Sequence, residues 1–507
     1  MFDCPLARRV LLSMSTRFRF ILPLLLFSAT LMISASIQKQ PLTVMQDDAF
    51  FYFTIAGNLV ERGILSFDGM TATNGFHPLW MGILAGLRYL IDDLSLYLLV
   101  SLFLSLILNS IAGILFLHFA YDRFSSPVTA VILLLLLRYL RDFSLMCMET
   151  SVLLPLLFAE LVLLEKLDTK SEKADHAGLG VVIALAGLAR LDSALMGVFV
   201  IFAAAEKGGR KMLLPLALPS VAAGISYLTM NQLLFGTWFS VSGSLKASGF
   251  GLNENFAAQL FSTELQRPWG LYLLMLGPAL FCAFGRRISV SARVSGIFMV
   301  LFTIVQLFFS RWRLWYWYAY PAVLFLAFGV APVVDRLYRL FSIPCRIEKT
   351  LSSAVLLITS IAAVYWGLSY ARVPENDFRY RNMLIAEELS CTLPSDAVIA
   401  MGDRAGSFAC FFNGHVIQAE RLAGDHALAS AVKEQYLEKH LIERGAEYLL
   451  SWTGPHGVEE YGSWEIFIPD RAQCAAFNNL LVVYEEHEVA RWPEEDMSVF
   501  MWKLNEN

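Results

Sequence analysis

Two adjacent carboxylates, Asp47 and Asp48, are the residues of this sequence best placed to do acid–base chemistry. They follow the apolar stretch Phe20–Ile37 and begin the amphipathic stretch Asp48–Arg62, in which apolar residues recur at helical spacing. The dipole of a helix stabilises the charged form of carboxylates at its start, so one can accept a proton or bind a cation while the other orients it. The structural alternative is that one of them is only a helix N-cap.

Further polar groups interrupt apolar sequence at three other places. Asn74 and His77 lie in a Thr-Asn-Gly-Phe-His-Pro stretch, whose Asn-Gly and His-Pro pairs indicate tight turns. Glu149 lies between two apolar stretches, where a neutral residue would cost less free energy. Arg190 and Asp192 form a charge pair between two short apolar segments, and such a pair can also simply neutralise itself.

Cations and hydroxyl groups are concentrated in two later loops. They are Ser242, Ser244 and Lys246 in the first loop, and Arg311, Arg313 and Tyr316 in the second. Lysine and arginine combined with hydroxyl groups suit a phosphate oxyanion, while the aromatic run of the second loop suits either a sugar ring or the membrane interface. We expect these groups and the carboxylates to lie on one side of a membrane and to form one site.

The composition indicates the elements that must position these residues. The chain has 507 residues, of which 57% are hydrophobic and 16% charged, against roughly 25% charged in an ordinary soluble domain. It contains about eleven apolar stretches that can cross hydrocarbon about 30 Å thick, if short paired segments are included. We therefore predict an α-helical polytopic transmembrane domain over residues 1–371. Its first external loop, 38–93, is predicted to hold two interfacial helices, Asp48–Arg62 and Pro78–Ile91.

Basic clusters predict the topology of this domain. They precede the first apolar stretch and recur near residues 207–211, 286–287 and 336–349. The positive-inside rule places all of them, and hence the N-terminus, in the cytoplasm, so the predicted site lies outside. If the stretch Pro78–Ile91 crossed the membrane instead, the next loops would change sides. The net charge of −5 does not indicate the basic surface that is typical of nucleic-acid-binding proteins.

Residues 372–507 have the composition of a soluble domain. Ala397–Met401 is predicted to be a strand, Leu428–Arg444 a helix and Glu447–Trp452 another strand. Alternation of strands and helices is typical of an α/β domain, which the predicted topology places outside the cytoplasm.

The chain resembles the GT-C class of integral-membrane glycosyltransferases, particularly the bacterial relatives of protein O-mannosyltransferases, arabinofuranosyltransferases and the lipid A aminoarabinose transferase. The resemblance rests on the N-terminal span, Asp47-Asp48 with its interfacial helix, the loop ending in His77-Pro78, the acidic Glu149 and the C-terminal domain. One departure is that the start of the second span, Leu94–Leu99, lacks an arginine that the O-mannosyltransferase relatives carry there.

The resemblance implies a GT-C fold and transfer of a hexosyl or pentosyl group from a polyprenyl-phosphate donor to a hydroxyl acceptor. The acceptor would be a cell-envelope glycan, lipid or protein at the outer face of the bacterial cytoplasmic membrane. Asp47 or Asp48 would be the catalytic base or a metal ligand. The sequence leaves open whether a divalent cation takes part; if Mg²⁺ or Mn²⁺ does, Asp47, Asp48 and Glu149 would hold it.

The hypothesis gives the other polar residues a role in binding. Lys246, Arg311 and Arg313 would neutralise the leaving phosphate. The remaining groups would bind donor or acceptor: Asn74, His77, Glu149, Arg190, Asp192, Ser242, Ser244 and Tyr316. The alternatives are a transporter or lipid flippase, whose buried charges would line a pathway, and a non-catalytic glycan-binding membrane protein. The two halves of the sequence contain no matching broken segments of the kind found in many transporters.

Overall fold

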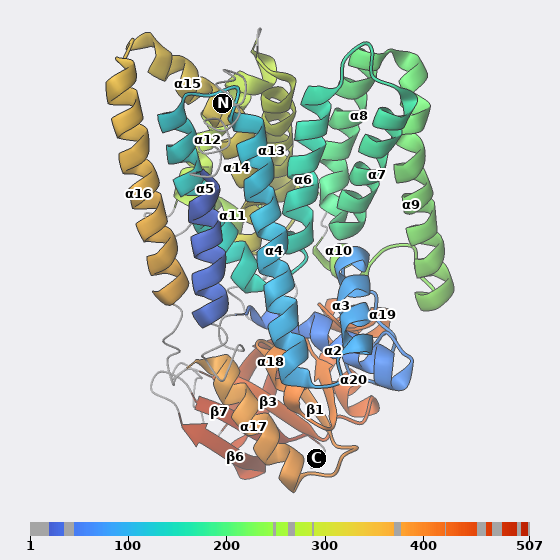
Figure 1. Cartoon of the computed structure of the whole chain (residues 1–507). Helices are drawn as coiled ribbons and strands as arrows, with labels where there is room; N and C mark the ends of the chain where they lie inside the picture. The colour runs from blue at the N-terminus through green and yellow to red at the C-terminus, as the bar shows by residue number, and fades with distance from the viewer. Residues whose placement is uncertain are drawn as a thin grey trace.

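The computed structural model describes residues 20–34, 45–246, 250–261, 269–285, 288–369, 377–420, 422–453, 463–468, 479–493 and 498–504. In these residues a bundle of long apolar helices lies over a smaller unit of strands and helices from the C-terminal part of the chain (Figure 1). Helices α2 (Asp47–Arg62) and α3 (Pro78–Leu90) lie where the two parts meet. The predicted domain boundary at residue 371 and the N-terminal arginines lie outside the described residues.

The helices of the bundle are apolar and pack through a buried interior. They are the first helix (Phe20–Ser34), α4 (Leu94–Ala120), α5 (Ser126–Met146), α6 (Thr150–Lys166), α7 (Lys173–Ala189), α8 (Ala194–Gly208), α9 (Leu213–Phe235), α12 (Trp269–Phe284), α13 (Val290–Phe308), α14 (Tyr320–Phe325), α15 (Ala331–Leu340) and α16 (Cys345–Ser369). Shorter helical segments are η2 (Leu191–Ser193), η3 (Arg210–Met212), α10 (Val241–Lys246), α11 (Glu254–Phe261), η4 (Tyr316–Ala319) and η5 (Leu326–Val330).

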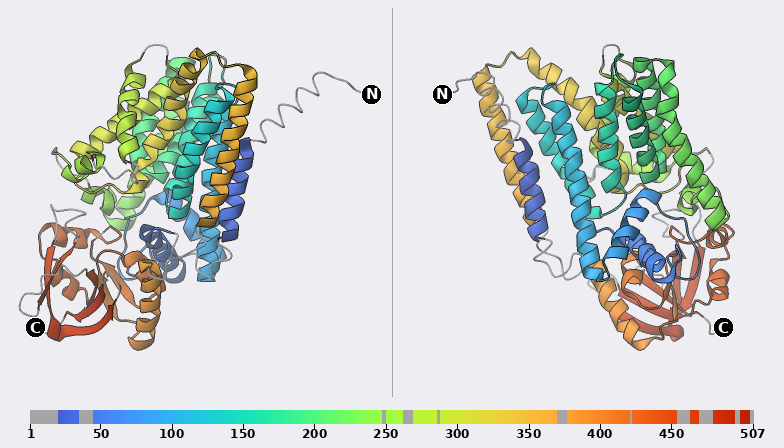
Figure 2. Two further views of the ribbon diagram at one scale, coloured as in Figure 1. Left: turned by 90° about the vertical axis from the view of Figure 1, so that its left-hand side faces the viewer. Right: turned by 45° about the vertical axis from the view of Figure 1, so that its right-hand side comes forward.

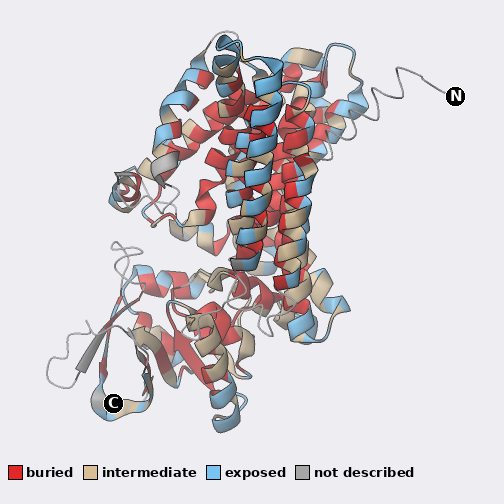
Figure 3. Ribbon diagram, turned by 60° about the vertical axis from the view of Figure 1, so that its left-hand side comes forward, coloured by how far each residue is buried: buried red, intermediate tan, exposed pale blue. Residues whose placement is uncertain are grey.

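Five of the described helical stretches are long and apolar enough to cross a membrane: Leu94–Ala120, Arg210–Phe235, Val290–Phe308, Tyr316–Leu340 and Cys345–Leu368. Figure 3 shows buried residues inside the bundle and exposed ones on the outward faces of its helices. On α16 the outward residues are apolar, since Ile358 and Ile361 are 55% and 60% exposed. Such faces are typical of helices surrounded by lipid. The total of about eleven spans stays a prediction.

The last helix of the bundle packs beside the first. Figure 2 shows α16 alongside helix Phe20–Ser34, and the Ser34 hydroxyl donates to the Gly367 carbonyl oxygen over 2.8 Å. A Cβ atom on Gly367 would lie 2.0 Å from Thr30 Oγ1, so only glycine allows this approach. The first and the last helix of the predicted transmembrane region therefore pack against each other.

Most sequence-predicted helices have the predicted bounds within a few residues. The predicted helices Asp48–Arg62 and Pro78–Ile91 are α2 and α3, and α2 ends where Gly63 takes the left-handed conformation, with φ of 72°. The predicted helix Leu428–Arg444 was wrong as a single element, because it is two helices, α19 (His426–Lys433) and α20 (Leu437–Glu443). Gln435, with φ of 60°, interrupts it. The break lets both helices bury apolar residues in one core.

The C-terminal unit contains a five-stranded mixed sheet with the order β2-β1-β3-β7-β6. Its strands are β1 (Val398–Met401), β2 (His415–Gln418), β3 (Tyr448–Thr453), β6 (Glu488–Pro493) and β7 (Ser498–Lys503). The same unit contains helices α17 (Phe378–Thr392) and α18 (Ala405–Phe411). A separate two-stranded sheet is formed by β4 (Ser463–Ile468) and β5 (Asn479–Tyr484). β1 is parallel to β2 and β3, while β7 is antiparallel to β3 and β6. The segments that follow the carboxyl ends of β1 and β2 both reach the first external loop.

Candidate active site

The first turn of α2 turns its two carboxylates toward different partners. Asp47 accepts hydrogen bonds from the Gly406 and Ser407 backbone N–H groups, each at 2.8 Å, and from the Ser407 hydroxyl at 2.5 Å. Its carboxylate thus joins α2 to α18 of the C-terminal unit. Asp48 instead lines a small cavity where α2, the bundle and the C-terminal unit meet.

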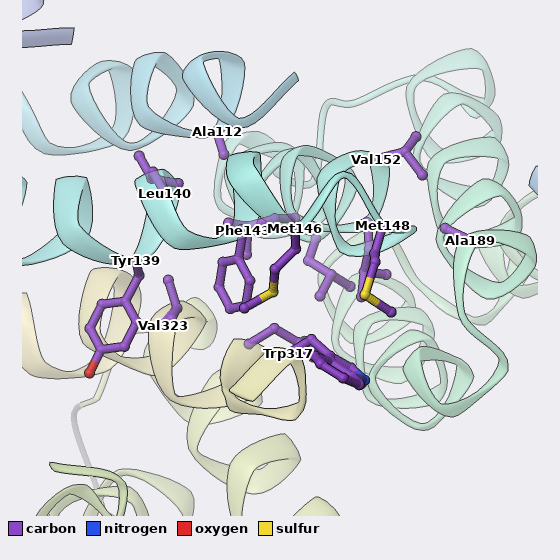
Figure 4. Packing of buried hydrophobic residues seen from close by; sticks show 14 of the residues in the cluster. Ala112, Tyr139, Leu140, Phe143, Met146, Met148, Val152, Ala189, Trp317 and Val323 are labelled. Carbon is purple, nitrogen blue, oxygen red and sulfur yellow. The ribbon is translucent and has the colours of Figure 1, made fainter. Parts of the chain in front are cut away.

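The cavity beside Asp48 brings together residues from seven separate parts of the chain. Its walls are formed by Asp48, Phe51, Tyr52, Ile55, Gly75, Phe76, His77, Met148, Glu149, Arg190, Ser242, Lys246, Trp317, Tyr318 and Leu422. Figure 4 shows Met148 and Trp317 among the packed apolar side chains of this region. The volume of this cavity is about 60 Å³.

One wall of the cavity is a buried network of charges and hydroxyl groups. Arg190 donates to Glu149 at 2.5 Å and to both oxygens of Asp192 at 3.1 and 2.8 Å. The Tyr52 hydroxyl donates to the other Glu149 oxygen at 2.9 Å. Glu149 is 2% exposed and Arg190 3% exposed, so the two charges neutralise each other away from water. Burial acts to raise the pKa of Glu149, but His77 and Arg190 stabilise the carboxylate and leave that pKa below its usual value.

The aromatic residues of η4 and α14 complete this network. The Arg190 guanidinium lies 4.7 Å from the ring centre of Tyr318 and 5.4 Å from that of Tyr320. Arg190, which also lines the cavity, is thus in contact with two carboxylates and two aromatic rings.

His77 lies at the edge of this network as a neutral imidazole. Burial lowers the pKa of His77 to about 4. Its Nε2 lies 3.9 Å from Glu149 Oε1, and its backbone N–H donates to the Tyr52 hydroxyl at 3.4 Å. Pro78 begins α3 directly after it and restricts the His77 backbone to the extended conformation observed.

Lys246 supplies a positive charge to the same cavity. Its ammonium group donates to the Tyr318 hydroxyl at 3.2 Å. Burial acts to lower the pKa of Lys246, but Tyr318 and Asp48 outweigh it and raise that pKa, so the side chain stays protonated. Unlike Arg190, this cation forms no ion pair within hydrogen-bonding distance among the described residues.

Asp48 has the protonation behaviour of a base that works near neutral pH. Burial raises the pKa of the Asp48 carboxyl to about 7, with Asp47, Glu149 and Asp403 adding to the shift and Lys246 opposing it. The helix dipole, expected from the sequence to keep both carboxylates ionised, is outweighed by burial at this position. A carboxylate with such a pKa is suited to general base catalysis.

The residues expected to bind a divalent cation do not form a common site. Asp47 is held by α18, and Glu149 is paired with Arg190 and Tyr52. In the part of the chain that the structure describes, no three His, Cys, Asp or Glu side chains are grouped as metal ligands. Because Mg²⁺ and Mn²⁺ require several available oxygen ligands, the side chains present do not fit such an ion.

Several residues predicted to contribute to the site lie outside the cavity. The Asn74 amide group donates to Asn231 and the Phe239 carbonyl and accepts from the Val241 N–H, so it anchors the start of α10. Ser244 donates within α10 to the Val241 carbonyl. In the second loop, Arg311 is exposed, Arg313 lies over Trp315 and Tyr316 donates to Asp142. Asp192 lies behind Arg190 as its partner.

Several residues that line the cavity were absent from the sequence-predicted site, among them Tyr52, Tyr318 and Leu422. Tyr52 is four positions after Asp48, so helical periodicity could have placed both on one face of α2. Tyr318 belongs to the aromatic run, but the choice of Tyr318 over Tyr316 depends on the turn of η4. Leu422 comes from the C-terminal unit, and no local pattern connects it with the site.

The opposite face of α2 borders a larger cavity of about 320 Å³. Its charged residues include Arg62, Arg88 and Glu61, and the Arg88 guanidinium lies 2.5 Å from Glu61. Neither Asp48 nor Lys246 lines it. The smaller cavity is therefore the one that contains both Asp48 and Lys246.

No protein-family model matches the chain, and no curated protein sequence matches it. Solved structures do match it. ArnT from Cupriavidus metallidurans bound to undecaprenyl phosphate aligns with a TM-score of 0.56 and 12% identity, over 90% of this chain and 97% of ArnT. The apo state of the same protein aligns with a TM-score of 0.52 and 13% identity, over 95% of this chain and 99% of ArnT. The chain thus has the GT-C fold that the sequence resemblance implied.

Proposed function

We propose that this chain is a glycosyltransferase that moves a sugar from a polyprenyl-phosphate donor to a hydroxyl acceptor. One observation carries the proposal: a carboxylate with a pKa near neutrality, Asp48, and a protonated amine, Lys246, face the same narrow cavity. The fold in which they lie is shared with ArnT, a protein solved with undecaprenyl phosphate bound.

In the proposed reaction, Asp48 is the general base. The acceptor oxygen forms a bond to the anomeric carbon of the donor while the acceptor proton passes to the Asp48 carboxylate. The bond between the anomeric carbon and the phosphate oxygen breaks, and its electron pair leaves with the polyprenyl phosphate. A positioned base contributes roughly 10²- to 10⁴-fold to such a rate.

Lys246 is the proposed partner of the leaving phosphate. Its ammonium group is held by Tyr318 on the same cavity as Asp48. Negative charge develops on the phosphate oxygen as the glycosidic bond breaks, and a fixed positive charge at that position stabilises the transition state. Arg311 and Arg313, which the sequence suggested for this role, lie outside the cavity walls.

The network around Glu149 is proposed to position the sugar. Neutral His77 can both donate and accept a hydrogen bond, which suits sugar hydroxyl groups. Ser242 adds a further hydroxyl group to the same wall. Arg190 holds Glu149 rigidly, so this wall is preorganised before substrate binds.

We further propose that the site lies at the outer face of the bacterial cytoplasmic membrane. The basic segments around 207–211 and 336–339 lie at the end of the bundle far from the C-terminal unit (Figure 1), and the positive-inside rule assigns that end to the cytoplasm. The chain then has about eleven spans, a cytoplasmic N-terminus and an extracytoplasmic C-terminal unit. A polyprenyl chain gains about 0.8 kcal/mol per buried CH₂, so its phosphate must be met at the membrane boundary.

The function is tested with purified full-length protein in proteoliposomes. Undecaprenyl-phosphate hexoses and pentoses carrying a radiolabelled sugar are supplied together with a cell-envelope fraction as the source of acceptor. The proposal expects label in a new hydroxyl-linked product and stoichiometric release of undecaprenyl phosphate. Movement of intact donor across the bilayer without release of undecaprenyl phosphate would instead establish a flippase. Saturable glycan binding with neither outcome would establish a non-catalytic protein.

A further inference from the structure

A charged side chain interrupts the apolar outward face of α5. Val131 and Leu135 on this face are each 40% exposed, and Arg138 is a third exposed residue of the same stripe. Positions 131, 135 and 138 have the spacing of one helix face. In a bundle surrounded by lipid, a charged residue on such a face is costly and marks a candidate functional site. The proposed reaction does not use Arg138.

Arg138 lies at the depth of lipid headgroups. One turn further along α5, the Arg141 guanidinium lies 5.5 Å from the ring centre of Trp366 in the neighbouring α16 (Figure 1). Trp366 is in the last turn of α16, and tryptophan is enriched where membrane meets water. Arg138 is three residues before Arg141 and hence about 4.5 Å deeper. The long side chain of arginine reaches the interface from this depth.

The neighbouring charges are paired with each other, and Arg138 is not. Arg141 donates to one oxygen of Asp142 at 2.5 Å, and the Tyr316 hydroxyl donates to the other oxygen at 2.5 Å. Among the described residues, Arg138 has no hydrogen-bond acceptor and no ion-pair partner. An anion at Arg138 therefore meets an uncompensated positive charge. Guanidinium groups bind phosphate oxygens in a bidentate manner.

The turn η4 lies between this face of α5 and the cavity beside Asp48. Tyr316, its first residue, stacks on Tyr139 of α5 with ring centres 6.4 Å apart, and the charge of Arg138 acts on the Tyr316 hydroxyl. The next two residues, Trp317 and Tyr318, line the cavity. Figure 4 shows Tyr139 and Trp317 in one packed cluster. The exposed cation and the proposed catalytic cavity are therefore connected through one short turn.

We propose that Arg138 forms a second lipid-phosphate site, which holds a polyprenyl phosphate outside the cavity. The phosphate binds the Arg138 guanidinium, and the apolar chain lies along the stripe of Leu135 and Val131. This stripe continues about 10 Å deeper into the bundle, so the cation and the apolar surface follow each other in the order of the lipid's own parts. The proposal rests on the proposed function, because that reaction uses and releases such a lipid.

Photo-cross-linking tests the site in the full-length protein without an acceptor. p-Benzoylphenylalanine at position 135 places a photoreactive group one turn below Arg138, and the protein is held in phosphatidylcholine nanodiscs with radiolabelled undecaprenyl phosphate. Labelling should be at least tenfold stronger than with radiolabelled undecaprenol, which has the chain but no phosphate. The matched control is position 181 on α7, where Val181 is 48% exposed, and it should not distinguish the two lipids. Equal labelling by both lipids at position 135 would overturn the proposal.

Substitutions in the probe-carrying protein identify the cation. Arg138→Gln should reduce labelling by undecaprenyl phosphate to the level of undecaprenol, while Arg138→Lys keeps the charge and should retain most of it. Arg346→Gln removes an exposed arginine at the opposite end of α16 and should have no effect. Undiminished labelling in Arg138→Gln would reject the site.

A competition experiment identifies the lipid. A tenfold excess of phosphatidylglycerol should leave most of the labelling by undecaprenyl phosphate in place, because the site binds the polyprenyl chain as well as the phosphate. Loss of labelling in proportion to the added phosphatidylglycerol would show a site for any anionic lipid and would contradict the assignment to polyprenyl phosphate.

Transfer measurements separate this proposal from the function on which it rests. Arg138→Gln should lower sugar transfer severalfold at subsaturating donor and leave the rate at saturating donor within about twofold, since the cavity is unchanged. Unaltered transfer at every donor concentration, together with unaltered labelling, would reject the second site and leave the glycosyltransferase function intact. Labelling that depends on Arg138 in a protein that transfers no sugar would reject the function alone.

Discussion

Asp47 and Asp48 are adjacent in the chain, yet Asp47 binds the backbone and hydroxyl of Ser407 while Asp48 faces the cavity that also contains Lys246. The two carboxylates therefore have different partners from the first turn of one helix. We propose on this basis that Asp47 docks the C-terminal unit and that Asp48 accepts the proton. Each assignment leads to a separate measurement.

Replacement of Asp47 should affect stability more than chemistry. Asp47→Ala removes the acceptor for two N–H groups and one hydroxyl of α18, and unpaired buried donors cost about 1–3 kcal/mol. We expect a lower midpoint of thermal unfolding and faster proteolysis between the bundle and the C-terminal unit. Gly406→Ala, whose Cβ would lie 2.3 Å from the Asp47 carbonyl oxygen, should have the same effect. Unchanged stability in both variants would contradict the docking role.

The transfer rate should depend on the protonation of Asp48. The Asp48 pKa is raised to about 7, and only the carboxylate form is a base. The rate should therefore rise about tenfold per pH unit below that value and level off above it. Steady-state kinetics at subsaturating donor, from pH 5 to pH 9, measure this profile. A midpoint near pH 4 would show that the active carboxylate is not the one described.

Lys246 should shift that profile in a known direction. Its charge opposes the rise in the Asp48 pKa, so Lys246→Met should move the midpoint to higher pH as well as lower the maximal rate. Lys246→Arg keeps the charge and should keep the midpoint. The same pH series on both variants makes the comparison. A midpoint that falls in Lys246→Met would contradict the proposed pairing of charges.

The pair of Glu149 and Arg190 should dominate the stability of the cavity wall. Glu149→Gln breaks the more deeply buried of the two ion pairs that Arg190 forms, and breaking a buried pair costs about 3–5 kcal/mol. The folded-state pKa of Glu149 lies below the ordinary 4.5. The stability it provides is therefore complete above pH 4.5 and is lost as the pH falls through the folded-state value.

Thermal unfolding at pH 7 and pH 4 tests this expectation. Glu149→Gln should destabilise strongly at pH 7 and show less further loss on acidification than the unmodified protein. Asp192→Asn is the control, because it removes the partially exposed partner of Arg190 and leaves Glu149 in place. A larger loss of stability at pH 7 in Asp192→Asn than in Glu149→Gln would show that Asp192, and not Glu149, contributes most to the stability of the cavity wall.

The helices were predictable from sequence because their signals are local. The apolar run that becomes α4 and the proline that starts α3 lie within the elements they define. The break at Gln435 was not predictable, since its left-handed conformation follows from packing two helices on one core. Local patterns thus give element bounds but not the adjustments that packing imposes.

The site was predictable only in part for a similar reason. Ionisable groups in apolar surroundings drew attention to Asp48, Glu149 and Lys246, which the fold brings to one cavity. The choice between Asp47 and Asp48 depends on Ser407, which lies 360 positions away in the sequence. The spacing of residues along the sequence predicts local contacts only, so it could not predict the contact between Asp47 and Ser407.

The comparison of Asp48→Asn with Asp47→Asn in the proteoliposome transfer assay tests the central claim most directly. Rates are expressed per folded molecule, so that a loss of stability does not count as a loss of catalysis. We expect Asp48→Asn to lower the transfer rate about 100-fold or more, while Asp47→Asn stays within about tenfold of the unmodified protein. Equal rates in Asp48→Asn and the unmodified protein, or a loss confined to Asp47→Asn, would contradict the assignment of Asp48 as the base.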